Sequence, residues 1–92
     1  GLLRPGMTVR ARLVKERFKD AIVVPQDAVL NGDQGASVFL EQDGLAVERP
    51  VVVSTVSDEM AVIESGLGVG DRLITRGARD LVNGERVEVL AN

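Results

Sequence analysis

With 92 residues, the chain has the length of one compact domain, or of one small domain with a piece of another. It contains no cysteine and no histidine, which excludes thiolate nucleophiles, imidazole bases, structural zinc sites and the usual transition-metal ligands, so we expect no enzyme and no cofactor. Residues 1–20 hold six basic and two acidic side chains, whereas residues 21–92 hold five basic and twelve acidic ones, and an acidic body with two aromatic residues argues against nucleic acid as a partner.

The first predicted strand follows a turn at Pro5-Gly6. From Met7 to Leu13, apolar residues alternate with polar ones, the period of two that is typical of a strand with one buried face. After a charged connector at residues 15–20, the apolar run at residues 21–24 predicts a second strand, which Pro25 ends because proline cannot donate to a ladder. We expect residues 26–35 to be irregular, with a single helical turn or a short extended piece before a loop.

The strongest local signal is a hairpin around Asp43-Gly44, a dipeptide favoured in two-residue turns with positive φ. Residues 37–42 and 45–53 flank it as strands. This turn places Leu40 opposite Val47 and Val38 opposite Arg49, with Phe39 on the other face. Pro50 within the second strand implies an edge position or a bulge.

Short strands are predicted at residues 60–63, 73–75 and 87–90, with glycine-marked turns between them. Gly66, Gly68 and Gly70 suggest a phosphate-binding loop, but that loop requires a helix after it, and residues 72–75 have the pattern of a strand. We therefore interpret these glycines as turn residues with Asp71 as a capping carboxylate. The expected turn residues are Pro5, Gly6, Pro25, Asp43, Gly44, Gly66, Gly70, Asp71, Gly77 and Gly84.

Two charged features are candidates for binding. The adjacent carboxylates of Asp58 and Glu59 are too few for a hard cation, which requires six or more oxygens, so a solvated turn is favoured and we expect no metal site. The basic face of the first strand either contacts an acidic partner or anionic lipid, or protects an exposed strand edge from pairing. The candidate partner-binding residues are Arg10, Arg12, Asp58, Glu59, Arg76 and Arg79.

An ordered series of short motifs covers nearly the whole chain. It consists of Leu3-x-Pro5-Gly6-Met7-x-Val9-x-Ala11-x-Leu13, Ala21-Ile22-Val23-Val24-Pro25-x-x-Ala28-Val29, Val38-Phe39-Leu40 with Asp43-Gly44, Glu48-Arg49-Pro50-Val51, Ile63-Glu64-Ser65-Gly66-Leu67-x-x-Gly70-Asp71-Arg72-Leu73, and finally Gly77 and Gly84. This series resembles the membrane fusion proteins, the periplasmic adaptors of resistance-nodulation-division efflux pumps. The acriflavine-type drug-efflux adaptors are the most similar subgroup.

The resemblance implies an all-β, mainly antiparallel fold: residues 1–20 as the last strand and connector of a β-barrel domain, and residues 21–92 as the membrane-proximal β-roll. It also implies a non-enzymatic adaptor in the periplasm that links an inner-membrane transporter to an outer-membrane channel and contacts other adaptor copies. The domains that reach the channel and the membrane anchor are expected before residue 1. The alternative is a cargo- or metal-sensing binding module of an export system.

The same resemblance implies that partners of the first strand lie outside this sequence. Unpaired strand edges beside an apolar face promote pairing with another chain. We therefore expect residues 1–20 to be either disordered or packed on a neighbouring copy.

Overall fold

The computed structural model describes residues 7–18, 20–33 and 35–90 of the chain. Its strands are β1 (Met7–Leu13), β2 (Ile22–Pro25), β3 (Leu30–Gly32), β4 (Gly35–Gln42), β5 (Leu45–Pro50), β6 (Val52–Val56), β7 (Met60–Ser65), β8 (Arg72–Arg76) and β9 (Val87–Leu90). Two single turns of 3-10 helix, η1 (Gln26–Ala28) and η2 (Ala78–Asp80), interrupt them. The all-β class predicted from the sequence is confirmed.

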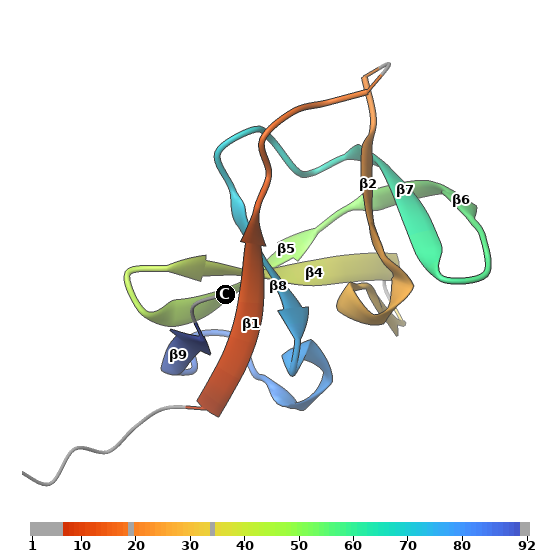
Figure 1. Ribbon diagram of the computed structural model, residues 1–92. Helices are drawn as coiled ribbons and strands as arrows, with labels where there is room; N and C mark the ends of the chain where they lie inside the picture. The colour runs from red at the N-terminus through yellow and green to blue at the C-terminus, as the bar shows by residue number, and fades with distance from the viewer. Residues whose placement is uncertain (1–6, 19, 34, 91–92) are drawn as a thin grey trace, which may run out of the picture.

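The strands form two sheets (Figure 1). The larger sheet has the order β3-β4-β8-β1-β9, with β5 also paired to β4, and the smaller has the order β2-β7-β6. The pairs are antiparallel except for β1 and β9, which run parallel. No described helix has the length and apolar character that crossing a membrane requires.

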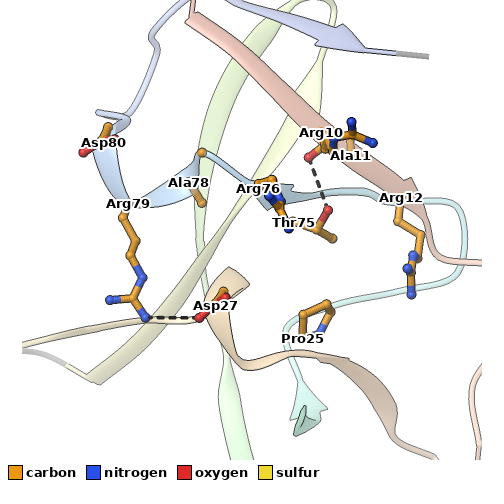
Figure 2. Close-up of a pocket in the computed structure, with 11 residues that line it drawn as sticks. Arg10, Ala11, Arg12, Pro25, Asp27, Thr75, Arg76, Ala78, Arg79 and Asp80 are labelled. Carbon is orange, nitrogen blue, oxygen red and sulfur yellow. Dashed lines mark hydrogen bonds and ion pairs between the residues drawn. The ribbon is translucent and has the colours of Figure 1, made fainter. Parts of the chain in front are cut away.

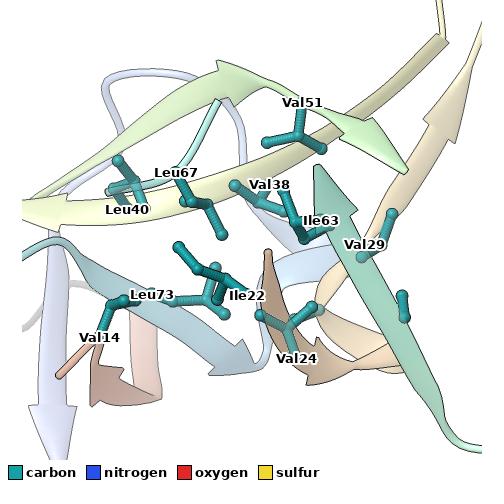
Figure 3. Close-up of a cluster of buried hydrophobic side chains, with 12 residues drawn as sticks. Val14, Ile22, Val24, Val29, Val38, Leu40, Val51, Ile63, Leu67 and Leu73 are labelled. Carbon is teal, nitrogen blue, oxygen red and sulfur yellow. The ribbon is translucent and has the colours of Figure 1, made fainter. Parts of the chain in front are cut away.

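The predicted hairpin is present, with Val38 opposite Arg49 and Leu40 opposite Val47. Its apolar residues, however, are buried on both faces of β4 rather than on one. Leu40 packs in a cluster between the two sheets (Figure 3), whereas Phe39 packs in a second cluster on the opposite face of the larger sheet. The neighbouring strand β8 divides its side chains in the same way, with Leu73 in the first cluster and Ile74 in the second. Strands β4 and β8 therefore form the centre of the fold.

The predicted strand at residues 45–53 is split between the two sheets. Strand β5 ends at Pro50, whose nitrogen cannot donate to the ladder, and β6 begins at Val52 in the smaller sheet. Between them Val51 is buried, and its N–H donates to the Ala36 carbonyl at 3.0 Å. Pro50 therefore marks the point at which the chain leaves one sheet for the other.

The expectation of an irregular stretch at residues 26–35 is wrong in part. The helical turn η1 is present, but Leu30–Gly32 forms β3 and pairs with the start of β4, from Leu30 opposite Ser37 to Gly32 opposite Gly35. Leu30 packs against the second cluster, and this burial accounts for the strand. Gln34, in the expected loop, lies outside the described residues.

The prediction that residues 1–20 are disordered or packed on a neighbouring copy is wrong for Met7–Leu13. Strand β1 pairs with β8 on one side and with β9 on the other, within the same chain (Figure 1). Val9 is 2% exposed in the second cluster. The strand forms because β8 and β9 pair with both of its edges and the second cluster covers its apolar face.

Candidate functional site

A groove of about 660 Å³ lies between β1, β8 and the two 3-10 turns. Its position follows from the alternation of side chains along β1. Arg12 and Arg10 lie two and four residues before Val14, respectively, and so on the same face of the strand. Val14 is covered by the smaller sheet, but β2 ends at Pro25, so the face is open at the two arginines.

The groove is lined by four arginines and two aspartates, Arg10, Arg12, Arg76, Arg79, Asp27 and Asp80. Figure 2 shows Arg12 on β1, Arg79 on η2 and Asp27 on η1 around the same opening. In a chain with a net charge of −3, this concentration of guanidinium groups gives the groove a charge opposite to that of the whole molecule.

Two backbone features bring the arginines of β8 and η2 to β1. A register irregularity between Arg10 and Ala11 places Arg10 directly opposite Arg76, and the Thr75 hydroxyl donates to the Arg10 carbonyl at 3.4 Å. Gly77 then turns the chain with a φ of 90°. A Cβ added at this position would lie 3.2 Å from Val9 Cγ1. This close approach holds η2, and with it Arg79, against β1.

The ion pair between Arg79 and Asp27 in the groove is exposed. Arg79 Nη2 lies 3.8 Å from Asp27 Oδ1, with the two side chains 67% and 87% exposed. An exposed pair of this kind contributes roughly 0–1 kcal/mol, so both groups are available to a binding partner.

Of the six candidate partner-binding residues, the structure brings four into this groove: Arg10, Arg12, Arg76 and Arg79. Asp58 and Glu59 lie elsewhere, on the exposed turn between β6 and β7. Backbone hydrogen bonds fix this turn, from Ser57 N–H to the Met60 carbonyl and from Gln26 N–H to the Glu59 carbonyl, both at 2.8 Å. Asp27, Asp80 and Thr75 could not be predicted as groove residues from the sequence, because their place in the groove depends on how distant strands pair.

Among the expected turn residues, Asp43, Gly44, Gly70 and Gly84 lie in turns. Gly68 N–H donates to Asp71 Oδ2 at 2.9 Å, the capping role expected of this carboxylate. A strand, β8, and not a helix follows the glycine-rich loop, which contradicts a phosphate-binding loop. Pro25 ends β2, Pro5 and Gly6 lie outside the described residues, and φ is positive at Asp43, Gly44, Gly66, Gly70, Gly77 and Gly84.

The chemistry available in the described ranges is that of exposed charges. They contain no group of three or more residues that could hold a metal ion, and no polar or charged residue is buried among them. What the groove provides is a set of planar guanidinium groups, which match carboxylate and phosphate geometry through paired N–H donors.

Comparison with known protein families explains the fold. The family described as "YknX, C-terminal permuted SH3-like domain" matches residues 21–89, which include β2 to β8 and most of β9. The chain belongs to this domain family. In the permuted SH3-like domain described here, η1, β8 and η2 come from the matched region, whereas β1 precedes it. The arginine groove is therefore assembled from the domain and from the strand before it.

Relatives of the chain are named as multidrug resistance proteins and as an efflux pump linker. It is 36% identical over 91 residues to the multidrug resistance protein MdtA of Pantoea ananatis and 35% identical over 89 residues to that of Klebsiella pneumoniae. It is 37% identical over 87 residues to the efflux pump periplasmic linker BepD of Brucella suis. These matches cover 94–98% of this chain but only 22% of each relative. The resemblance to efflux adaptors predicted from the motifs is confirmed, and the chain spans about a fifth of the length of these relatives.

Proposed function

We propose that this chain is the non-enzymatic, membrane-proximal part of a periplasmic adaptor that serves a resistance-nodulation-division efflux pump. The proposal is carried by the match of nearly the whole chain to MdtA and to a protein named as a periplasmic efflux linker. The adaptor links an inner-membrane transporter to an outer-membrane channel. Under this proposal, its anchor and the domains that reach the channel belong to other parts of a longer protein.

Within this proposal, residues 1–20 correspond to the end of a β-barrel domain and residues 21–92 to the β-roll. The family match supports this division, because it begins at residue 21. Strand β1 nevertheless pairs with β8 and β9, so the two parts share a sheet in this chain.

We further propose that the arginine groove is a surface for protein contacts of the adaptor. Exposed arginines are frequent at the centre of protein interfaces, since one guanidinium group donates several hydrogen bonds and packs on apolar groups. The groove offers four of them in one concave surface, together with the apolar Ala11 and Pro25.

The adaptor role is tested by exchange of the matching region. This chain replaces the corresponding fifth of Pantoea ananatis MdtA, and the chimaera is expressed in a strain that lacks MdtA. We expect drug resistance to return, measured as the minimal inhibitory concentration, whereas a matched chimaera with the core change Leu73→Asp remains sensitive. A chimaera that is exported and folded but leaves the strain as sensitive as the deletion contradicts the proposal.

A further inference from the structure

The position of β1 removes one explanation for Arg10. Charged residues on a strand protect it from pairing with another chain only when the strand lies at the edge of a sheet. Strand β1 lies between β8 and β9, so both of its edges are already paired along part of its length. Arg10 pairs with both neighbouring strands and has no edge to protect, whereas the pairing with β9 ends at Arg10 and does not reach Arg12.

Two of the arginines in the groove lie directly opposite each other on neighbouring strands. Like charges directly opposite each other on neighbouring strands are destabilising, and Arg10 is opposite Arg76. Within the described residues, Arg12 and Arg76 form no ion pair. An anionic group in the groove can accept hydrogen bonds from Arg12 and Arg76, so the groove gains from the arrival of negative charge.

The same chain carries a complementary feature at the β6–β7 turn. Asp58 and Glu59 are the only adjacent acidic residues in the sequence, and both are exposed. Neither is in an ion pair with another described residue, and neither lines the groove of its own chain. The hydrogen bonds from Ser57 and Gln26 hold the turn in one shape, which lowers the entropy lost when it binds. In Figure 1 this turn projects at the side of the molecule, beyond the end of the small sheet.

We propose that the Asp58-Glu59 turn of one copy of this chain docks in the arginine groove of a second copy. Two neighbouring carboxylates on a narrow, fixed turn suit a concave surface lined by guanidinium groups. A planar anionic membrane fits less well, because Asp27 and Asp80 flank the arginines and the body of the chain is acidic. The inference deepens the proposed function, in which adaptor copies contact one another, by naming the two surfaces that meet.

Disulfide trapping tests this contact, because the chain has no cysteine of its own. Ser57→Cys places a thiol beside the acidic turn and keeps both carboxylates, and Asp80→Cys places one in the groove and keeps all four arginines. The two variants are mixed and oxidised, and the rate of cross-linked dimer formation is measured. The matched control replaces Ser57→Cys by Gln42→Cys, which lies beside Asp43 on another exposed hairpin turn.

At about 0.01 M salt we expect the 57–80 pair to cross-link roughly fivefold faster than the 42–80 pair, an advantage that disappears at about 1 M salt. Arg12→Glu with Arg76→Glu in the chain that carries Asp80→Cys removes the advantage. Asp58→Lys with Glu59→Lys in the chain that carries Ser57→Cys restores it. Circular dichroism verifies that each variant is folded. If the variant with Arg12→Glu and Arg76→Glu does not fold, the variant with Arg12→Gln and Arg76→Gln replaces it.

Equal rates for the two cysteine pairs at low salt, or an advantage that survives charge reversal of the groove, overturn the proposal. Such a result leaves the adaptor role standing, since that role is tested separately by drug resistance. Conversely, if the chimaera does not restore resistance but the 57–80 pair cross-links in a charge-dependent way, the adaptor role fails and the contact between copies stands.

Discussion

Gly66 connects β7 to the loop before β8 in a backbone conformation that other residues rarely adopt. Its φ is 106°, and a Cβ there meets the Pro50 carbonyl oxygen at 2.5 Å and Val51 Cα at 2.8 Å. These atoms belong to the backbone at the point where the chain passes from β5 to β6, so they cannot move aside without disturbing both sheets. Gly66 is thus required for two reasons, its conformation and its contact.

We predict that Gly66→Ala lowers the free energy of unfolding by about 2–4 kcal/mol, the sum of backbone strain and overpacking. Gly70→Ala is the matched control, because its φ of 100° is similar but nothing lies within 4 Å of a Cβ there. The control should lose only about 1–2 kcal/mol from strain. Urea denaturation of both variants measures the difference, and equal losses contradict the steric contact.

Arg76 illustrates a conflict between stability and binding at a single residue. We predict that Arg76→Glu raises the free energy of unfolding by about 0.2–1 kcal/mol, because it replaces a like-charge pair with Arg10 by an opposite-charge pair. The same change should weaken the contact with an acidic turn. Thermal melting at low and high salt checks the first effect, which should shrink as salt is added.

The control for this prediction is Arg72→Glu at the other end of β8. Arg72 Nη1 lies 3.5 Å from Glu41 Oε1, so its reversal replaces attraction by repulsion. The melting temperature should fall for Arg72→Glu and rise for Arg76→Glu. A fall in both indicates that Arg76 contributes to the fold in a way that its charge does not explain.

Strand β4 contributes buried side chains to both apolar clusters. Leu40 is 0% exposed and Leu45, on the other side of the same turn, is 39% exposed. We predict that Leu40→Ala destabilises the chain by about 2–5 kcal/mol, since it removes a large side chain from the core between the sheets. Leu45→Ala should cost less than about 1 kcal/mol. Denaturant melts of the two variants test this ranking, which fails if their midpoints coincide.

The hairpin also shows what local sequence can and cannot predict. Its register follows from a two-residue turn, so Val38 and Arg49 could be paired correctly from Asp43-Gly44 alone. The burial of both faces of β4 was missed, although the unbroken run Val38-Phe39-Leu40 is the usual sign of a strand covered on both sides. Alternation within one strand does not show that a second apolar cluster covers its other face.

Long-range pairing limited the prediction of the candidate site. Arg10 and Arg12 could be placed on one face of a strand by their spacing, and Arg76 and Arg79 were recognised only as separate charges. Their meeting depends on the register of β1 against β8, which joins residues 66 positions apart. Nothing in either segment fixes that register by itself, so the groove could be derived only from the folded chain.

Strand β1 is held by β9 as well as by β8. Val87 is buried in the second cluster, and β9 pairs with Met7–Arg10. We predict that deletion of residues 87–92 lowers the free energy of unfolding by roughly 2 kcal/mol or more, the value of a buried valine. It should also remove hydrogen-exchange protection from the amides of residues 8–10.

The matched control is Glu88→Ala, which changes an exposed side chain of β9 and leaves its backbone pairing intact. Amides of Val62 and Ile63 in the smaller sheet serve as an internal reference. Unchanged exchange at residues 8–10 after the deletion means that β8 alone holds β1.

The parallel pairing of β1 with β9 also determines when the chain can finish folding. These are the first and last described strands, and their contact closes a loop that contains nearly every other residue of the chain. Contacts between such distant positions slow folding, because the entropy of closing the loop is lost before the contact stabilises anything. During synthesis, β1 leaves the ribosome before the other described strands, and β9 leaves it after them. Until then its apolar face has no cover from β9, and this interval is the period in which the chain is most exposed to aggregation.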